Sequence, residues 1–217
     1  MPFKMTVSRS KKILSLLYDY YGETVPDLDF KNIYQLTIAV VLSAQTTDRQ
    51  VNGVTKQLFE KYPDFSSLGG ARYSDVENIV KSTGFFRTKT RNIIALSRMI
   101  TARFGGLLPD NMNQLVELPG VGRKSANVIL SIGYGIPGLA VDTHVARISN
   151  RLGYINSSSP VEIEKKLCSI IDPAEWKKTH LLFIKHGRSI CKARNPECSR
   201  CPVAKFCDFY RENIPAP

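Results

Sequence analysis

Apolar residues recur along most of this chain at the three- and four-residue spacing of a helix rather than the two-residue spacing of a strand. Breaks rich in glycine, proline and asparagine separate the apolar segments at intervals that suit helices of ordinary length. The sequence therefore predicts an all-α fold with roughly ten helices. The clearest periodic segments are Ile13–Tyr20, Ile93–Phe104, Val128–Ile132, Val145–Leu152, Ile163–Ile170 and Trp176–Ile184.

The 217 residues could form one large domain or two small ones. No stretch approaches the roughly 18 to 20 apolar residues of a membrane span, and Met1-Pro2-Phe3-Lys4 lacks the apolar region of a secretory signal. We therefore expect a soluble, cytoplasmic protein that associates with the nucleoid and not with a membrane.

Thirty Lys and Arg against 19 Asp and Glu give a net charge of +11. This charge favours a nucleic acid partner, although a solvated basic surface would also explain it.

A glycine-rich turn, Leu118-Pro119-Gly120-Val121-Gly122-Arg123-Lys124, lies between two helical segments. Glycine permits positive φ angles or a close backbone approach, and Gly122 also suits the start of the following helix. The amides at that helix start, together with its partial positive charge, would hold a DNA phosphate without reading bases. We expect Leu118, Gly120, Val121, Gly122 and Arg123 to contact DNA, with the Lys124 amine at the mouth of the cradle.

A second motif, Val141-Asp142-Thr143-His144, places an aspartate 18 residues after Lys124, beyond the Gly/Pro-rich connection 133–138. That connection must interrupt helix and is the best internal boundary. If Lys124 and Asp142 act together, the site lies in a groove between two lobes. Asp142 is also a good N-cap for a helix beginning at Thr143, and it could serve both purposes.

Four of the five cysteines, Cys191, Cys198, Cys201 and Cys207, lie near the end of the chain with gaps of six, two and five residues. An intracellular setting disfavours disulfides, so the cluster indicates a metal site. The spacing fits a [4Fe-4S] cluster or a structural zinc ion. Cys168, within an apolar helical pattern, is expected to be a core thiol.

The hairpin with Lys124, the distal Asp142 and the cysteine tail together resemble the endonuclease III branch of the helix-hairpin-helix DNA glycosylases. The resemblance runs from about residue 10 to about residue 210. It implies a two-lobed helical fold: residues 26–136 form a helical-barrel domain that contains the hairpin, and residues 1–25 with 137–217 form a discontinuous domain. The latter would carry a [4Fe-4S] cluster on Cys191, Cys198, Cys201 and Cys207.

The resemblance also implies a monomeric, bifunctional enzyme of base excision repair that acts on oxidised pyrimidines in duplex DNA. An amine such as that of Lys124 can attack C1′ of the sugar, displace the base and support cleavage of the strand by β-elimination. Asp142 would stabilise positive charge on the sugar or receive a proton.

Several DNA contacts follow from the same resemblance. Gln45 would fill the gap left by a base that has moved out of the stack, and Phe85 would be the wedge, with Phe86 as competitor. A helix cap or surface amide remains open for Gln45, and core packing for Phe85. His144 would face the same groove as Asp142, while Lys192 and Arg194 would form a basic loop, unless they are merely solvated charges. His180 and His186 are expected to pack or to lie at the surface.

Two other functions remain open. One is a mismatch-directed glycosylase acting on G·T, G·U or adenine mismatches, and the other is a helix-hairpin-helix module that binds DNA without catalysis.

Overall fold

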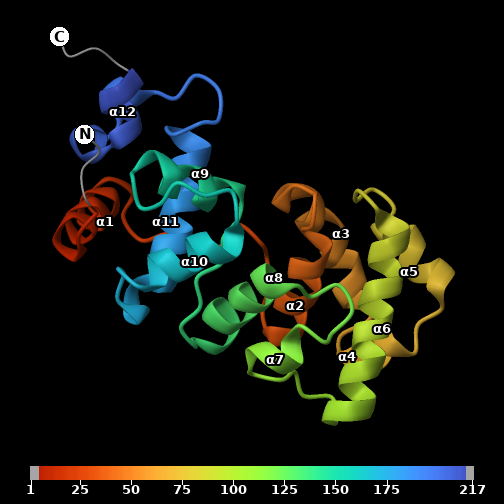
Figure 1. The fold of residues 1–217 in the computed structure, drawn as a ribbon. Coiled ribbons are helices and arrows are strands. Elements are labelled where there is room, and N and C mark those ends of the chain that lie inside the picture. The colour runs from red at the N-terminus through yellow and green to blue at the C-terminus, as the bar shows by residue number, and fades with distance from the viewer. Residues whose placement is uncertain (1–4, 214–217) are drawn as a thin grey trace. The chain divides into compact units, whose positions relative to one another are not determined.

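The computed structural model describes residues 5–213, which form twelve α-helices and no strand (Figure 1). The all-α prediction is thus confirmed. Most helices begin where the sequence supplies a capping side chain whose oxygen accepts a hydrogen bond from a backbone amide of the first turn. These caps are Thr6, Asn32, Thr47, Asp64, Asn111, Asp142 and Ser159.

The chain divides into two compact units. We call Pro26–Ile136 the hairpin unit, and Met1–Val25 with Pro137–Pro217 the cysteine unit. Each unit has its own hydrophobic core. Within the described residues, no helix combines the length and the apolar character that crossing a membrane would require.

In the hairpin unit, helix α2 (Ile33–Leu42) has eight of its ten residues buried. A helix that is apolar on all sides belongs in the interior, and α2 accordingly packs against its neighbours on several sides. The longest helix, α6 (Phe86–Phe104), packs against α2, α4 (Phe65–Gly69) and α5 (Tyr73–Val80). The remaining helices of this unit are α3 (Asp48–Lys61), α7 (Met112–Leu115) and α8 (Arg123–Val128).

Helix α8 continues without a break as a π-helix, η1 (Ile129–Tyr134). The expectation that the connection 133–138 interrupts helix from its first glycine is therefore wrong for Gly133. A Cβ at Gly133 would lie 2.1 Å from Ile33 Cδ1, so glycine here allows the close approach of α2. The helix ends at Gly135, whose φ of 68° is the left-handed geometry of a C-cap.

The cysteine unit joins the start of the chain to its end. Helices α9 (Thr143–Arg151) and α11 (Trp176–Ser189) pack closely, and α1 (Val7–Tyr21) lies against α11. Arg9 Nη2 donates to Leu152 O at 3.0 Å, to Phe206 O at 2.6 Å and to Asp208 Oδ1 at 2.8 Å. The unit also contains α10 (Pro160–Cys168), α12 (Asp208–Asn213) and the 3₁₀ turns η2 (Pro173–Glu175), η3 (Cys198–Arg200) and η4 (Ala204–Phe206).

Candidate functional site

The glycine-rich turn adopts the geometry of a hairpin between α7 and α8. Gly120 has a φ of 81°, and a Cβ there would lie 2.9 Å from Asn92 Nδ2 and 3.0 Å from Val41 Cγ1. Val121 N donates to Leu118 O at 3.0 Å and closes the turn. Gly120 thus needs to be glycine for both reasons that the sequence suggested.

Gly122 does not share those constraints. It is the N-cap of α8 with an ordinary φ of −94°, and no protein atom lies within 4 Å of the position that a Cβ would take. The idea that Gly122 supplies a positive φ is therefore wrong. Its exposed face leaves room in front of the first amides of α8, which a helix start leaves without intrahelical acceptors.

Lys124 is the second residue of α8, and its side chain is exposed, as is that of Arg123. Leu118 and Val121 differ, because their side chains are 2% and 4% exposed and belong to the core of the hairpin unit. Any contact of these two residues with DNA must come from their backbone. The hairpin therefore exposes backbone groups and the side chains of Arg123 and Lys124, while Leu118 and Val121 attach it to the core.

Asp142 caps α9 in the cysteine unit. Its Oδ1 accepts a hydrogen bond from Val145 N at 2.8 Å, and the residue is half-buried. The capping role that the sequence left open is thus present. The second carboxylate oxygen, Oδ2, is the atom through which Asp142 could also act in chemistry, since capping uses Oδ1.

His144 lies on the first turn of α9 and is half-buried. Its Nδ1 is 3.1 Å from Arg147 Nη2. Burial lowers the pKa of His144, while the nearby Asp142 acts in the opposite direction. Gly187 of α11 makes room for this contact, because a Cβ there would lie 2.8 Å from His144 Nδ1.

Two arginines one helical turn apart connect α9 to the cysteine loop, residues 191–207. Arg147 Nε donates to Cys191 O at 3.0 Å and its Nη2 to Gly187 O at 2.9 Å. Arg151 Nη1 donates to Lys192 O at 2.7 Å and to Cys191 Sγ at 3.3 Å. The helix that begins at Asp142 is thereby fixed to the loop. Neither arginine is among the predicted site residues, although two arginines four residues apart on the helix after Asp142 share one helix face.

The four cysteines of the loop line a common cavity, together with apolar side chains such as Ile148 and Val203. Four thiolates facing one space are what a [4Fe-4S] cluster requires. Within residues 5–213, no three His, Cys, Asp or Glu side chains gather closely enough for a single ion. The donor set and its cavity fit the iron–sulfur cluster that the sequence suggested.

Backbone amides donate to two of these sulfurs. The Cys201 sulfur accepts a bond from the Val203 amide, and the Cys207 sulfur from the amides of Tyr210 and Phe209. Burial raises the pKa of Cys201 to about 12 and that of Cys207 to about 11. Cys191, Cys198, Cys201 and Cys207 would hold the cluster through their deprotonated sulfurs.

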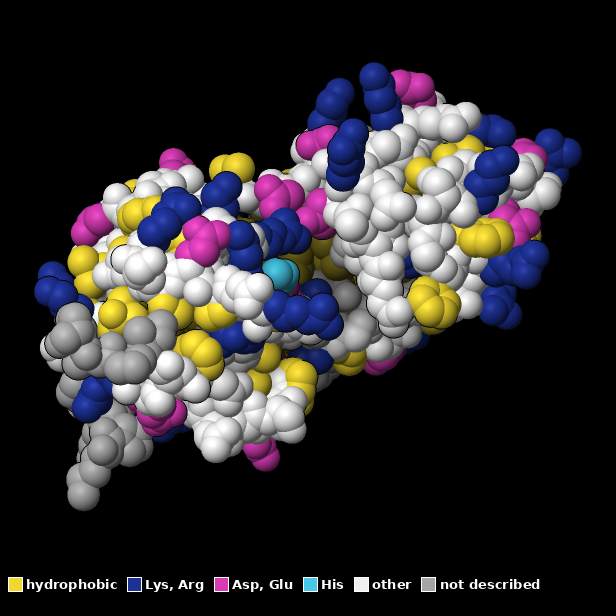
Figure 2. All heavy atoms as spheres, turned by 90° about the horizontal axis from the view of Figure 1, so that it is seen from above, with side chains coloured by type: hydrophobic (Ala, Val, Ile, Leu, Met, Phe, Trp, Pro, Cys, Tyr) yellow, Lys and Arg dark blue, Asp and Glu magenta, His cyan; other side chains and the backbone are white. Residues whose placement is uncertain are grey.

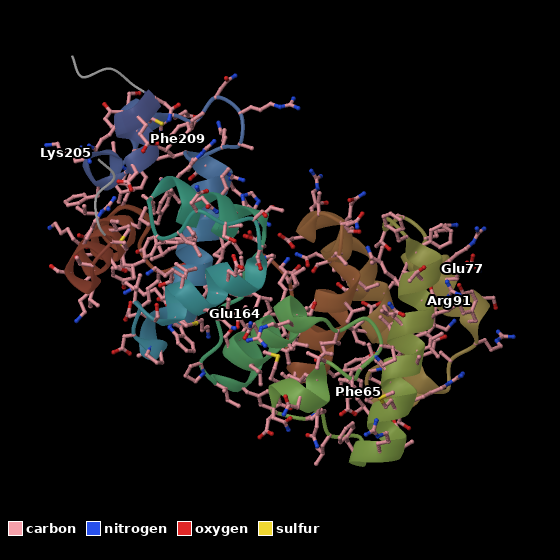
Figure 3. The ribbon with its side chains drawn as sticks, viewed as in Figure 1. Phe65, Glu77, Arg91, Glu164, Lys205 and Phe209 are labelled. Carbon is pink, nitrogen blue, oxygen red and sulfur yellow. The ribbon has the colours of Figure 1, made fainter. Side chains whose placement is uncertain are left out.

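Helices α11 and α12 both make contacts around the cysteine loop. The Arg151 guanidinium lies over the ring of Phe209, with Cζ 4.5 Å from its centroid; Figure 3 labels Phe209. On α11, His186 Nε2 is 3.5 Å from Cys201 Sγ, and its Nδ1 is 2.9 Å from Tyr21 Oη. The packing role expected for His186 is confirmed. His180 also packs, with Nδ1 2.8 Å from Ala140 O, and both imidazoles are buried.

The basic residues of the loop differ in their availability. Lys192 Nζ lies 2.6 Å from Glu197 Oε1, and Arg200 Nη1 lies 2.7 Å from Glu197 Oε2. Arg194 is exposed, and the described residues offer it no ion pair. Lys and Arg side chains stand on the surface of both units (Figure 2). Among the loop residues, Arg194 is thus better placed than Lys192 to meet a phosphate.

Gln45 and Phe85 both project from turns of the hairpin unit. Both are exposed, Phe85 to 68%, and both have left-handed backbone, with φ of 52° and 55°. Core packing of Phe85 is therefore wrong, whereas its competitor Phe86 is partly buried against the core. Gln45 lies in the turn between α2 and α3 and caps neither helix, which leaves it as an exposed amide.

Comparison with known proteins decides the family. Residues 38–173 match the HhH-GPD superfamily base excision DNA repair protein, and residues 191–207 match the iron-sulfur binding domain of endonuclease III. The chain is 42% identical over 200 residues to endonuclease III of Synechocystis sp., which covers 92% of this chain and 91% of that protein. The chain belongs to the endonuclease III family. Endonuclease III of Bacillus subtilis is 41% identical over 201 residues, covering 90% of this chain and 92% of the relative.

The fold agrees with this assignment. A solved structure of a trapped endonuclease III–DNA covalent intermediate, an estranged-adenine complex, is 40% identical with a TM-score of 0.92 and covers 97% of this chain and 100% of that chain. Membership of the endonuclease III family confirms the helix-hairpin-helix glycosylase fold and the [4Fe-4S] cofactor. The protein is a DNA glycosylase of base excision repair that binds DNA.

Proposed function

We propose that this protein removes oxidised pyrimidines from duplex DNA and then cleaves the strand 3′ to the resulting abasic site. The observation that carries the proposal is the exposed Lys124 amine on the first turn of α8, directly after the Gly120 turn. The similar endonuclease III that was trapped in a covalent intermediate with DNA supports an enzyme-bound nucleophile.

The proposed reaction begins when the neutral Nζ of Lys124 attacks C1′ of the extruded nucleotide. The C1′–N bond breaks, and the base leaves with its electron pair and takes up a proton. Loss of a proton from the amine and opening of the sugar ring give an imine between Lys124 and C1′. Removal of a C2′ proton then expels the 3′ phosphate by β-elimination, and hydrolysis of the imine releases Lys124.

Asp142 would stabilise positive charge that develops on the sugar, or receive the proton of the attacking amine. One carboxylate oxygen holds the α9 amide, which fixes the orientation of the group before DNA binds. The second oxygen then needs no rearrangement to act, which is the condition for electrostatic stabilisation of a transition state.

Borohydride trapping tests the nucleophile. Incubation with duplex containing thymine glycol or an abasic site should give a covalent adduct, because borohydride reduces the imine to a stable amine. Lys124→Ala should abolish the adduct. Lys56→Ala is the matched control, since Lys56 is an exposed lysine of the same unit outside the hairpin. Trapping that persists in Lys124→Ala would refute the assignment.

Asp142→Asn separates chemistry from capping. Asparagine caps helices about as well as aspartate, so α9 should form normally while the negative charge is lost. We expect base release to slow by about 100-fold or more, as for loss of one transition-state contact, with DNA affinity almost unchanged. Unaltered rates of base release would show that Asp142 only caps α9.

A panel of duplexes with defined lesions tests the substrate class. Preferential excision of oxidised pyrimidines supports the proposal, whereas excision confined to G·T, G·U or adenine mismatches would identify a mismatch glycosylase. Salt-dependent binding without any excision would indicate a module that only binds DNA.

A further inference from the structure

The two exposed turns that carry Gln45 and Phe85 are in contact within the hairpin unit. A Cβ at Gly84 would lie 3.2 Å from Gln45 O and 3.7 Å from Thr46 Oγ1, so glycine allows the loop before α6 to press against the turn after α2. Gln45 and Phe85 are two of the three non-glycine residues with positive φ in the described chain. Strained backbone of this kind persists only where the surrounding structure holds it in place.

A buried lysine lies beneath these two turns. Lys89 is 4% exposed, although it is a residue type that is almost never fully buried unless paired. It stands one turn along α6 from Phe85, and its backbone N donates to Phe85 O at 3.1 Å. Its side chain crosses to the other turn, where Nζ donates to Thr46 Oγ1 at 2.5 Å. Lys89 is thus anchored next to Phe85 by an ordinary bond of the first helical turn, and its amine links this end of α6 to the Gln45 turn.

The contact continues into the Gln45 turn. Thr46 Oγ1 accepts from Lys89, and it lies 3.4 Å from Ala44 O, to which its own hydrogen can be donated. Thr46 N also donates to Ser43 O at 3.2 Å. The amine of Lys89 is therefore connected to both residues that flank Gln45.

The environment of Lys89 argues against a role as a simple packing residue. No carboxylate lies within 4 Å of its amine in the part of the chain described. Burial without a counter-charge lowers the pKa of Lys89 to about 8. Methionine would fill the same space without that cost, because burying a charge without an ionic partner is unfavourable. What lysine adds at this position is the hydrogen bond to Thr46.

We infer that Lys89 and Thr46 form a strap that locks the Gln45 and Phe85 turns together, so that both residues enter the duplex as one rigid unit while the damaged nucleotide leaves the stack. The inference rests on the proposed function and on the expectation that Gln45 and Phe85 insert into the duplex. Lys89 touches no substrate atom in this scheme and acts as a positioning residue. The strap holds the two strained turns in their DNA-ready form before binding, which reduces the ordering that extrusion of the base requires.

Lys89→Met removes the amine but keeps the length and apolar stem of the side chain. We expect single-turnover excision of thymine glycol from a fully paired duplex to slow by about 10- to 100-fold, the loss typical of a slightly misplaced group. Excision of the same lesion from a duplex with an unpaired bubble should slow much less, because the base there is already out of the stack. Fluorescence of 2-aminopurine opposite the lesion, which reports unstacking, should rise less with the variant than with the parent.

Thr46→Val and the double variant test the coupling. If the strap acts as one element, Lys89→Met with Thr46→Val should excise no more slowly than the slower single variant. Independent, multiplicative losses would overturn the strap. Arg91→Met is the matched control, since Arg91 is an exposed cation two residues further along α6 (Figure 3) and should leave the 2-aminopurine signal unchanged.

The outcomes separate this inference from the proposed function. If the parent protein excises no lesion, the proposed function fails. If the parent excises and Lys89→Met matches it on paired duplex, or slows equally on paired and bubble duplex, only the strap fails. Absorbance of the iron–sulfur cluster and helical circular dichroism verify that each variant is folded, and Thr46→Val tests the same hydrogen bond if Lys89→Met is unstable.

Discussion

The hairpin unit and the cysteine unit are both helical, yet they close their cores in different ways. The core of the hairpin unit consists of aliphatic and aromatic side chains from one continuous stretch of chain. The core of the cysteine unit joins α1 to segments more than a hundred residues away and includes Cys207, with Cys191 and Cys201 packed against it. One unit is closed by apolar side chains, and the other includes the cysteine ligands in its packing.

The difference reflects the elements that each unit has available. The hairpin unit contains the 19-residue α6 and a nearly fully buried α2. Residues 191–213, the last described segment of the cysteine unit, contain only two 3₁₀ turns of three residues each and the six-residue α12. Such short elements bury little apolar surface, so we propose that the cluster, bound by Cys191, Cys198, Cys201 and Cys207, supplies the missing stabilisation.

Removal of the cluster should have the largest effect and should be confined to one unit. Oxidation and chelation of the full-length protein should speed amide hydrogen exchange in α9, α11 and α12 by about 100-fold or more, because the ligands then leave the core. Amides of α2 and α6 should keep their protection. Cys201→Ala should have the same effect, whereas Cys168→Ala, outside the proposed ligand set, should not. If amides of both units lost protection equally, the cluster would not stabilise the cysteine unit selectively.

Leu96→Ala tests the reverse direction. Leu96 is fully buried in the core of the hairpin unit, and its truncation should destabilise that unit by about 2 to 5 kcal/mol. Cluster absorbance at about 400 nm should remain, since the four proposed cysteine ligands lie in the cysteine unit and not in the hairpin unit. Val116→Ala, at a 42% exposed position, is the control with little expected change. Hydrogen exchange of α6 measures the effect.

Two glycines within helices provide a matched pair. A Cβ at Gly187 of α11 would meet His144 Nδ1 at 2.8 Å and Arg147 Nη2 at 3.0 Å, so Gly187→Ala should cost about 1 to 3 kcal/mol in the cysteine unit. A Cβ at Gly53 of α3 would meet no atom within 4 Å. Gly53→Ala should therefore stabilise the hairpin unit by about 0.5 to 1 kcal/mol. Urea unfolding, monitored by hydrogen exchange in each unit, would measure both changes in stability. A stabilised Gly187→Ala or a destabilised Gly53→Ala would contradict these expectations.

The stability of the hairpin unit should also depend on pH. The pKa of Lys89 is lowered from 10.5 to about 8 by burial, so the unfolded chain binds its proton more tightly than the folded one. The resulting destabilisation is fully present below pH 8 and fades as the pH rises toward 10.5. The advantage in urea midpoint of Lys89→Met over the parent should accordingly shrink from pH 8 to pH 10. A constant difference would show that Lys89 keeps an ordinary pKa.

Much of the fold could be predicted from local patterns. The apolar periodicity of segments such as Ile93–Phe104 predicted helices because a helix must bury one face. Gly133 was expected to interrupt the helix, but it lies inside η1. Glycine destabilises an isolated helix, yet it is tolerated where a neighbouring helix must approach closely. Lys89 was missed, although it extends the buried spacing of Ile93, Leu96 and Ile100 by one turn. Patterns record which face is buried, and they do not show how a buried charge is satisfied.

Local sequence is sufficient to predict the helical class, the cap at Asp142, the tight turn at Gly120 and the four-cysteine loop, because each depends on neighbours within a few residues. Other contacts exist only in the folded protein: the bond between Lys89 and Thr46, the attachment of α9 to the cysteine loop through Arg147 and Arg151, and the contacts of Arg9 with Phe206 and Asp208. These contacts join residues separated by about 40 to 200 positions. Their energies arise only once folding has brought the partners together and removed the water between them.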